Sequence, residues 1–174
     1  MNNILDSRVQ AKIKGIKLVI FDFDGVFTDN CVYVSDDGRE TVRCWRSDGL
    51  GLSRIKEIGL KIAIVSTESN GVVSKRAKKL KLRCSQGVKN KAEEVLSLCN
   101  GLGVNPINTM FVGNDINDIP AFRIVGLPVG VADSHPAIHR YIEFITNKPG
   151  GAGAVREICD LIMESQDQNN FNER

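Results

Sequence analysis

Hydrophobic positions along the chain fall into short, continuous runs that are separated by longer segments with helical periodicity. The clearest runs, Leu18–Phe21 and 62–65, contain β-branched residues and have the length of a strand. Buried strands are predicted at 17–22, 60–66, Thr109–Gly113 and 127–131, with a fifth within 141–146. Strands that are apolar on both faces indicate a parallel sheet that is covered on both sides.

Helices are predicted between these strands. Ser47 and Asp48 offer an N-cap for the first helix, and Gly59 follows its end. The predicted helices cover residues 48–58, 70–80, 91–102, 119–125 and 154–163. This alternation predicts an α/β, Rossmann-like parallel sheet with helices on both faces. No linker or internal repeat divides the sequence, so we expect one domain over residues 1–165, followed by a disordered polar tail over residues 166–174.

A β-hairpin is predicted directly after the first strand. Segments 31–35 and 40–45 flank Asp36-Asp37-Gly38, which is a strong turn signal. A two-residue turn at the Asp-Gly step would place Cys31 opposite Cys44. The five cysteines include no CxxC pair, however, which is typical of reduced thiols in a cytoplasmic protein. Free cysteines are therefore expected rather than a disulfide.

Composition narrows the classes of function. The 174 residues are 42% apolar, which suits one domain with a full hydrophobic core. The formal net charge of +2 gives no reason to expect binding to nucleic acid or to a membrane. No apolar run approaches the ~20 residues that span a bilayer, and the polar N-terminal segment does not resemble a signal peptide. We therefore expect a cytoplasmic protein.

Polar side chains gather where the predicted strands end. They are Asp22 and Asp24 after the first strand, Ser66 after the second, Asn114, Asp115 and Asp118 after the third, and Lys91 at the start of a helix. The carboxyl ends of parallel strands meet at one edge of a sheet, where ligands bind. Several carboxylates at one place repel one another unless a cation neutralises them. Mg²⁺, which prefers oxygen ligands, is the simplest such cation.

These residue types suit phosphoryl transfer at a metal. A carboxylate beside Mg²⁺ stays ionised and can attack phosphorus to give an aspartyl phosphate. A second carboxylate two residues later can protonate the leaving oxygen and then deprotonate water. A hydroxyl group and a lysine can bind the phosphoryl oxygens as negative charge develops. The cluster therefore predicts a site for phosphoryl transfer.

The order of these residues resembles the four motifs of the haloacid dehalogenase superfamily of phosphotransferases. The matching stretches are DFDGVFT at residues 22–28, Ser66, Lys91, and GNDIND at residues 113–118. The resemblance implies that Asp22 is the nucleophile. It implies that Asp24 is the general acid and base, with its carbonyl oxygen on Mg²⁺, and that Ser66 and Lys91 bind phosphate.

The last motif implies the remaining ligands of the metal. By resemblance, Asn114, Asp115 and Asp118 complete the site that the two aspartates of the first motif begin. Many members of the superfamily have aspartate at the position of Asn114. The direct ligand is therefore either Asn114 or Asp115, and Asp115 is favoured.

The spacing of the motifs narrows the resemblance to a capless group. About 40 residues separate Asp24 from Ser66 and about 24 separate Ser66 from Lys91, which leaves no room for a cap domain. The chain resembles the capless sugar-acid phosphatases, namely 3-deoxy-octulosonate 8-phosphate and deaminoneuraminate 9-phosphate phosphatases and the phosphatase-like module of acylneuraminate cytidylyltransferases. In that group a homotetramer supplies the missing cover. Hairpin 31–45 is thus expected to close the active site of a neighbouring subunit.

The segment after the strand-ending serine bears on the substrate. Octulosonate enzymes typically continue with Gly-Arg, whereas Thr67 and Glu68 follow here, which resembles the nine-carbon, neuraminate-related branch. Glu68 can accept hydrogen bonds from sugar hydroxyls, and Arg76 and Lys79 can face the substrate carboxylate. Thr28 is also assigned to substrate binding. A nine-carbon sugar-acid phosphate is therefore preferred, with 3-deoxy-octulosonate 8-phosphate as the alternative.

Two other classes of protein fit the sequence less well. A signalling receiver domain places its phosphorylated aspartate on a middle strand, and no aspartate ends the second strand here. A non-catalytic, tetramerising module related to acylneuraminate cytidylyltransferase would not need both Asp22 and Asp24. His135 and His139 have the spacing of a metal pair, but no third ligand is near and Pro136 marks a helix start, so surface histidines are expected.

Overall fold

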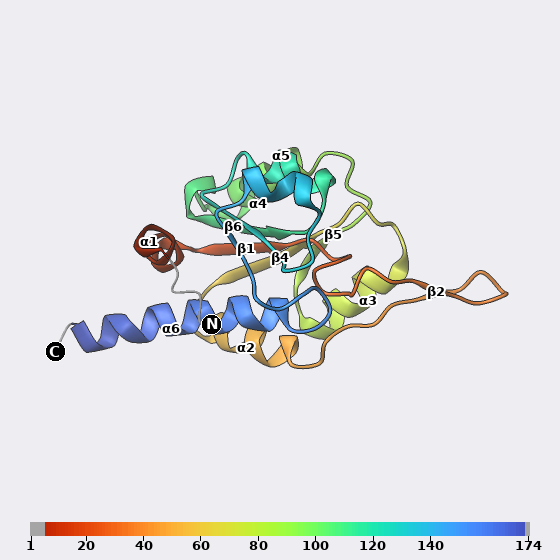
Figure 1. Cartoon of the computed structure of the whole chain (residues 1–174), viewed down its shortest axis with the longest axis horizontal. Helices are drawn as coiled ribbons and strands as arrows, with labels where there is room; N and C mark the ends of the chain where they lie inside the picture. Colours follow the sequence, from red (N-terminus) through yellow and green to blue (C-terminus); the bar gives the residue numbers. More distant parts are fainter. Residues whose placement is uncertain (1–5, 173–174) are drawn as a thin grey trace.

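A parallel sheet forms the centre of the molecule in the computed structural model, which describes residues 6–172 (Figure 1). Within these residues the sheet has six strands in the order β5-β4-β1-β6-β7-β8. Their bounds are β1 Leu18–Phe21, β4 Lys61–Val65, β5 Arg83–Ser85, β6 Thr109–Gly113, β7 Leu127–Gly130 and β8 Phe144–Ile145. The fully buried β1 pairs in parallel with both β4 and β6. The predicted α/β fold is confirmed.

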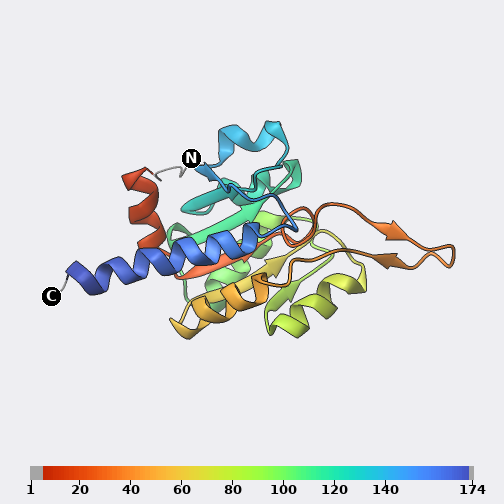
Figure 2. The ribbon, with the colours of Figure 1, turned by 60° about the horizontal axis from the view of Figure 1, so that its bottom comes forward.

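Helices cover both faces of the sheet, as Figures 1 and 2 show. One face carries α1 (Ser7–Gly15), α2 (Asp48–Glu57), α3 (Gly71–Leu80) and α6 (Ala154–Asn172), and the other carries α4 (Lys91–Leu102), α5 (Ile119–Phe122) and the 3-10 helix η3 (Pro136–Tyr141). Alternation along β1 divides the core, since Val19 and Phe21 pack on the first face and Leu18 and Ile20 on the second. Apolar residues thus hold β1 rigidly from both sides.

Helices α2 and α6 pack closely because a glycine lies between them. A Cβ atom at Gly51 would lie 2.8 Å from both Arg156 Cδ and Cys159 Cβ. Real Cβ atoms do not approach other atoms so closely, so only glycine permits this packing without a shift. The contact fixes the start of α6 against the start of α2.

The ends of the chain differ from the prediction. Helix α1 was not predicted, although Val9 and Ile13 are buried one turn apart. Helix α6 continues to Asn172, whereas the sequence predicted an end at residue 163 and disorder from residue 166. The extra segment contains glutamate, serine and glutamine but no glycine or proline, so nothing in it stops a helix. Residues 173–174 of the predicted tail lie outside the described residues.

The hairpin is confirmed, but its turn is one residue longer than predicted. Strands β2 (Tyr33–Val34) and β3 (Glu40–Thr41) pair Tyr33 with Thr41, which shifts the expected register by one. Three residues, 36–38, form the turn, and Gly38 takes the left-handed conformation with φ +78°. Cys31 and Cys44 therefore do not oppose one another, and both are free thiols, as expected.

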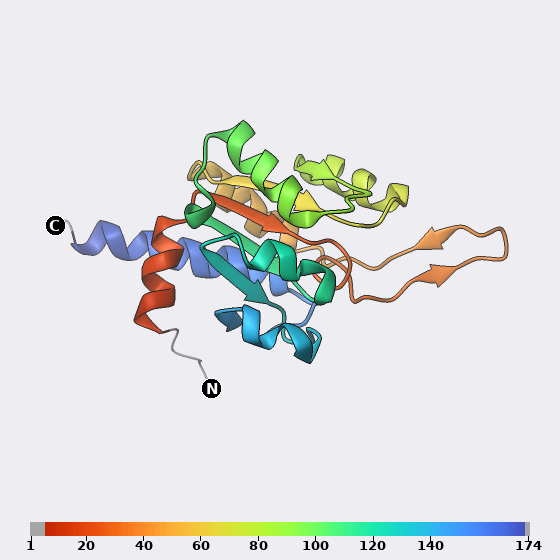
Figure 3. The ribbon, with the colours of Figure 1, turned by 90° about the horizontal axis from the view of Figure 1, so that it is seen from above.

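The hairpin projects well beyond the body of the molecule in all three views (Figures 1, 2 and 3). Its apolar residues are largely exposed, at 52% for Val32, 60% for Tyr33 and 67% for Val34. Val42 and Cys44 near the base of the hairpin pack against the core, whereas the apolar residues 32–34 have no cover within the described part of the chain and face solvent. No helix among the described residues has the length and apolar character needed to cross a membrane.

Candidate active site

The end of the central strand places Asp22 and Asp24 at the carboxyl edge of the sheet. Asp22 continues the ladder, since its N–H donates to Val112 O at 2.9 Å. Its Oδ1 accepts the N–H of Phe23 at 2.7 Å, and only 3% of the residue is exposed. Gly25 then turns the chain with φ +74°. A Cβ on Gly25 would lie 2.0 Å from Asn114 Nδ2, so this turn packs directly against the loop that follows β6.

Lys91 lies beneath this edge and joins two carboxylates. Its Nζ is 2.9 Å from Asp22 Oδ2 and 2.6 Å from Asp118 Oδ1, and all three residues are buried. The lysine is the first residue of α4, and Asn90 caps that helix by accepting the N–H of Ala92. Three residues that the sequence assigned to one site thus come together from three segments of the chain.

Asp118 uses both of its oxygens within the protein. While Oδ1 binds Lys91, Oδ2 accepts the N–H of Asn114 at 2.8 Å and of Asp115 at 3.2 Å. Asp118 ends the 3-10 helix η2 (Ile116–Asp118). These contacts point its carboxylate toward the lysine and the loop backbone, and it does not line the cavity at the two aspartates.

A cavity of about 280 Å³ opens beside the two aspartates. Its lining residues are Asp22, Asp24, Asn30, Thr67, Asn114, Asp115, Ile116 and Asn117. Three of these residues carry carboxylates and none carries a positive charge. Such a donor set, which is rich in carboxylate and amide oxygen, fits a hard divalent cation such as Mg²⁺.

The carboxylates of the cavity are held in an unfavourable electrostatic environment. Burial raises the pKa of Asp22, and the charge of Asp118 raises it further, while Lys91 opposes both effects. Burial likewise raises the pKa of Asp24, with a further contribution from the charge of Glu68. Burial alone would lower the pKa of Lys91, but the charges of Asp22 and Asp118 outweigh it and raise that pKa above its usual value.

A bound cation would relieve this repulsion. Among residues 6–172 no group of three or more histidine, cysteine, aspartate or glutamate side chains is arranged as a complete metal site. Ligands for an ion would therefore include amide or main-chain oxygens as well as carboxylates. Asp115 has one oxygen already engaged, because its Oδ1 accepts the N–H of Ile116 at 2.7 Å.

Ser66 directly follows β4, which ends one residue earlier than the predicted strand, and is buried. Its N–H donates to Ser85 O at 2.9 Å, and its Oγ accepts the N–H of Glu68 at 3.1 Å. Its carbonyl oxygen accepts the N–H of Val88, which ties the segment before Lys91 to the strand end. The neighbouring Thr67, which we did not assign to the site from the sequence, is the residue of this strand end that lines the cavity.

The four predicted substrate-binding residues do not line the cavity. Thr28 is buried, and its Oγ1 accepts the N–H groups of Gly25 and Asn30. Glu68 Oε1 accepts the N–H groups of Ser69 at 2.6 Å and Asn70 at 2.8 Å, just before α3 begins. Arg76 Nη2 donates to Trp45 O at 3.1 Å. Arg76 and Lys79 line a separate groove of about 610 Å³ between α2 and α3, together with other residues that include Arg46 and Lys56.

Three cavity residues besides Thr67 were also missed: Asn30, Ile116 and Asn117. Ile116 and Asn117 lie within the motif at residues 113–118. Asn117 Nδ2 donates to Thr67 Oγ1 at 3.4 Å across the cavity. Asn30 follows Asp29, and an Asp-Asn pair is a turn signal that could have directed attention to it.

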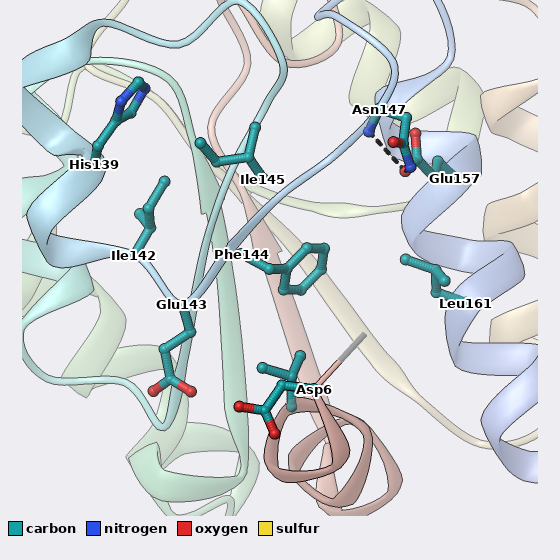
Figure 4. Close-up of a pocket in the computed structure, with 10 residues that line it drawn as sticks. Asp6, His139, Ile142, Glu143, Phe144, Ile145, Asn147, Glu157 and Leu161 are labelled. Atoms are coloured by element: carbon teal, nitrogen blue, oxygen red, sulfur yellow. Dashed lines mark hydrogen bonds between the residues drawn. The ribbon is translucent and has the colours of Figure 1, made fainter. Parts of the chain in front are cut away.

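A second cavity, of about 410 Å³, lies between α1, η3, β8 and α6 (Figure 4). Its carboxylates are already engaged, because Glu157 accepts the N–H of Asn147 and Lys148, and Glu143 pairs with Lys12. His139 at its border is exposed, as is His135, in agreement with the prediction of surface histidines. This cavity lacks the buried lysine and unbalanced carboxylates of the site at the strand ends.

The chain is similar to proteins of known families. Residues 76–158 match a family model described as haloacid dehalogenase-like hydrolase. The chain is 35% identical over 159 residues to the 3-deoxy-D-manno-octulosonate 8-phosphate phosphatase of Escherichia coli. The aligned region covers 91% of this chain and 85% of that protein.

Solved structures agree with this assignment. The 3-deoxy-D-manno-octulosonate 8-phosphate phosphatase of Moraxella catarrhalis, in complex with a magnesium ion, a phosphate ion and a KDO molecule, has a TM-score of 0.88 and 34% identity over 95% of both chains. The enzyme of the same name from Yersinia pestis has a TM-score of 0.89 and 33% identity over 92% of this chain and 88% of its own. The chain therefore belongs to the haloacid dehalogenase-like hydrolases, as its motifs indicated.

Proposed function

We propose that the protein is a Mg²⁺-dependent phosphatase that hydrolyses the phosphomonoester of a keto sugar acid. The observation that carries this proposal is the buried Lys91, which binds both Asp118 and Asp22, and Asp22 in turn lines a cavity together with Asp24. An ammonium group buried beside a nucleophilic carboxylate can bind the phosphoryl oxygens as negative charge develops on them.

Asp22 acts as the nucleophile in the proposed reaction. An oxygen of Asp22 attacks phosphorus, the bond between phosphorus and the sugar oxygen breaks, and the sugar oxygen takes a proton from Asp24. Asp24 then takes a proton from water, whose oxygen attacks phosphorus and frees Asp22. The raised pKa of Asp24 suits the first step, because it favours the protonated carboxyl group that the leaving oxygen needs.

The metal would be held at the open side of the same carboxylates. We assign it to Asp22, to the carbonyl oxygen of Asp24, and to Asn114 or Asp115 in the loop after β6. When bound, Mg²⁺ supplies positive charge that neutralises the carboxylates and the phosphate. Asp118 is better suited to positioning Lys91 and this loop than to direct ligation, because both of its oxygens are engaged.

The comparisons favour an eight-carbon substrate over the nine-carbon one that the sequence segment suggested. The relatives from Escherichia coli and Moraxella catarrhalis are both 3-deoxy-D-manno-octulosonate 8-phosphate phosphatases, and the latter was solved with KDO. We therefore propose 3-deoxy-octulosonate 8-phosphate as the substrate. A nine-carbon acid phosphate stays the second candidate, because Thr67 at the cavity and Glu68 replace the Gly-Arg pair expected of the octulosonate branch.

The test measures phosphate release from the eight-carbon phosphate, a nine-carbon phosphate and an aryl phosphate. We expect the eight-carbon compound to have the highest kcat/KM, and we expect EDTA to abolish activity that Mg²⁺ restores. Asp22→Asn should lower kcat by roughly 10³-fold or more, whereas Glu57→Gln at an exposed position of α2 should not. Equal rates for wild type and Asp22→Asn would exclude the proposed enzyme, and faster release from the nine-carbon compound would reverse the choice of substrate.

The hairpin suggests that the active site is completed by another copy of the chain. The cavity at Asp22 has no cap domain over it within residues 6–172, and the apolar hairpin residues 32–34 have no cover within the same part of the chain. We propose a homotetramer in which hairpin 31–45 of one subunit closes the site of its neighbour.

A further inference from the structure

The loop between the first motif and the hairpin is held in one conformation by polar contacts. Thr28 Oγ1 accepts the N–H of Gly25 at 3.1 Å and of Asn30 at 3.3 Å. Asp29 Oδ2 lies 2.9 Å from Arg43 Nε on the opposite arm of the hairpin. The backbone of Thr28 also forms an isolated antiparallel β-bridge with that of Cys44 on the same arm. Both ends of the loop are therefore fixed.

A glycine turn from the C-terminal part of the chain packs against the same loop. A Cβ on Gly151 would lie 2.3 Å from the backbone nitrogen of Asp29, and one on Gly150 would lie 1.9 Å from Gly25 O. The N–H of Gly151 donates to Val26 O at 3.1 Å. With this backbone directly beneath it, the loop has little space in which to change conformation.

Asn30 stands at the end of this fixed loop in a backbone conformation that glycine adopts more readily. Its φ is +61°, and within the described residues Lys81 is the one other non-glycine residue at positive φ. Asparagine tolerates this region better than most residues but still less well than glycine. Glycine would thus suit the backbone better, but glycine lacks the carboxamide that asparagine supplies at this position.

That carboxamide is available to a ligand. Asn30 lines the cavity with Asp22 and Asp24, and its side chain has no hydrogen-bond partner among the side chains and backbone that the structure describes. The two other carboxamides of the cavity are placed differently, since Asn117 donates to Thr67 and Asn114 packs against Gly25. A neutral group with both donor and acceptor atoms suits hydroxyl groups better than it suits a phosphate.

We propose that Asn30 is a specificity-determining residue whose carboxamide hydrogen-bonds hydroxyl groups of the sugar-acid part of the substrate. The inference rests on the proposed phosphatase function. It divides the site into two parts. Lys91 and the residues at the ends of β1 and β4 act on the phosphoryl group, and Asn30 at the cavity border recognises the polyhydroxylated leaving group.

The decisive variant is Asn30→Gly, which keeps the backbone conformation and removes only the carboxamide. We compare kcat/KM for the sugar-acid phosphate with kcat/KM for an aryl phosphate, which has no hydroxyl groups to recognise. The ratio of the two should fall about tenfold in Asn30→Gly, the size expected for one lost hydrogen bond. The loss should appear mainly as a higher KM for the sugar-acid phosphate.

Lys81→Gly is the matched control. It makes the same change at the other non-glycine position of positive φ, at the end of α3, and should leave the ratio unchanged. Thermal unfolding should show that neither glycine variant is less stable than wild type. Asn30→Asp, which keeps the shape but adds a charge, gives a second measurement and should also lower the ratio.

Each outcome bears on a different claim. An unchanged ratio in Asn30→Gly and Asn30→Asp would overturn the role of Asn30, and so would an equal fall of kcat/KM for both substrates, which would indicate a general effect on the site. If wild type released no phosphate from any of these compounds, the proposed phosphatase function would fail, and the specificity role with it.

Discussion

The charge balance of the site depends on a single residue, Lys91. One ammonium group pairs with Asp22 and Asp118, so this buried group alone carries a net negative charge before Asp24 and Asp115 are counted. Removing one partner from a buried ion pair leaves uncompensated charge in a poorly solvated place. The residues to which we assign the chemistry are therefore also residues on which the local fold is expected to depend.

Replacing Lys91 by methionine should abolish activity and destabilise the protein. Lys91→Met leaves Asp22 and Asp118 buried without their cation, so the free energy of unfolding should fall by about 3–5 kcal/mol. Urea unfolding in EDTA measures this loss without help from a bound metal, and phosphate release should fall by at least ~10²-fold. Lys89→Met, two residues earlier and exposed, is the control and should match wild type in both assays. Similar stability of the two variants would contradict the ion pair.

At the residue scale the structure brings together the inner residues that the sequence assigned to one site, but not those assigned to its border. Asp22, Lys91 and Asp118 were identified because their order and spacing follow the strand ends, where a parallel sheet must bring side chains together. Arg76 and Lys79 were expected at the substrate, yet they lie in the groove between α2 and α3. Helical spacing shows which residues share a face, but not where that face points relative to a distant strand end.

At the scale of elements, the start of α2 contains a buried carboxyl group that joins two helices. Asp48 Oδ1 accepts the N–H of Arg156 at the start of α6 at 3.2 Å, while Oδ2 is buried without a partner in the described structure. Burial raises the pKa of Asp48 to about 7, although the N–H of Arg156 and the charges of Arg76 and Arg156 oppose the shift. The contact between the two helices is therefore sensitive to pH.

The sign of this effect follows from the two pKa values of Asp48. Between about pH 4 and pH 7 the folded protein holds a proton on Asp48 that the unfolded chain has lost, so the free energy of unfolding falls as the pH rises. Asp48→Asn cannot ionise and should remove that part of the slope, on the order of 2–4 kcal/mol between pH 4 and pH 8. Urea unfolding across this range measures it, with Asp36→Asn as the control for one lost carboxylate. If the free energies of unfolding of wild type and Asp48→Asn changed in parallel with pH, the pKa of Asp48 would not be raised in the folded protein.

The elements that the sequence predicted well are those with strong local patterns. Apolar runs identified β1, β4, β6 and β7, because a strand buried on both faces leaves a clear signal. The edge strand β5 was missed, since Arg83-Cys84-Ser85 contains no apolar run. The hairpin turn was misjudged by one residue because Asp36-Asp37-Gly38 is compatible with both a two-residue and a three-residue turn, and only pairing decides between them.

At the scale of the whole molecule, the hairpin is the feature that a single copy does not explain. Its antiparallel ladder has two residue pairs, Tyr33 with Thr41 and Val34 with Glu40. An isolated two-stranded hairpin is only marginally stable in water. Apolar residues that are exposed at this position, next to a cavity without a cap, favour burial by another subunit.

The variant Tyr33→Ser/Val34→Ser tests this arrangement. Both side chains are exposed in the single chain, at 60% and 67%, so removing them should cost the monomer fold little. If neighbouring subunits bury them, the double variant should lose the mass of the wild-type assembly in sedimentation equilibrium and most of its phosphatase activity, because the sites would then be open. Ile107→Ser is the matched control, since Ile107 is 64% exposed on the 3-10 helix η1 (Pro106–Asn108), far in sequence from the hairpin, and should change neither property. A wild-type protein that sediments as a monomer, or a double variant that keeps its mass, would mean that the hairpin does not close a neighbouring site.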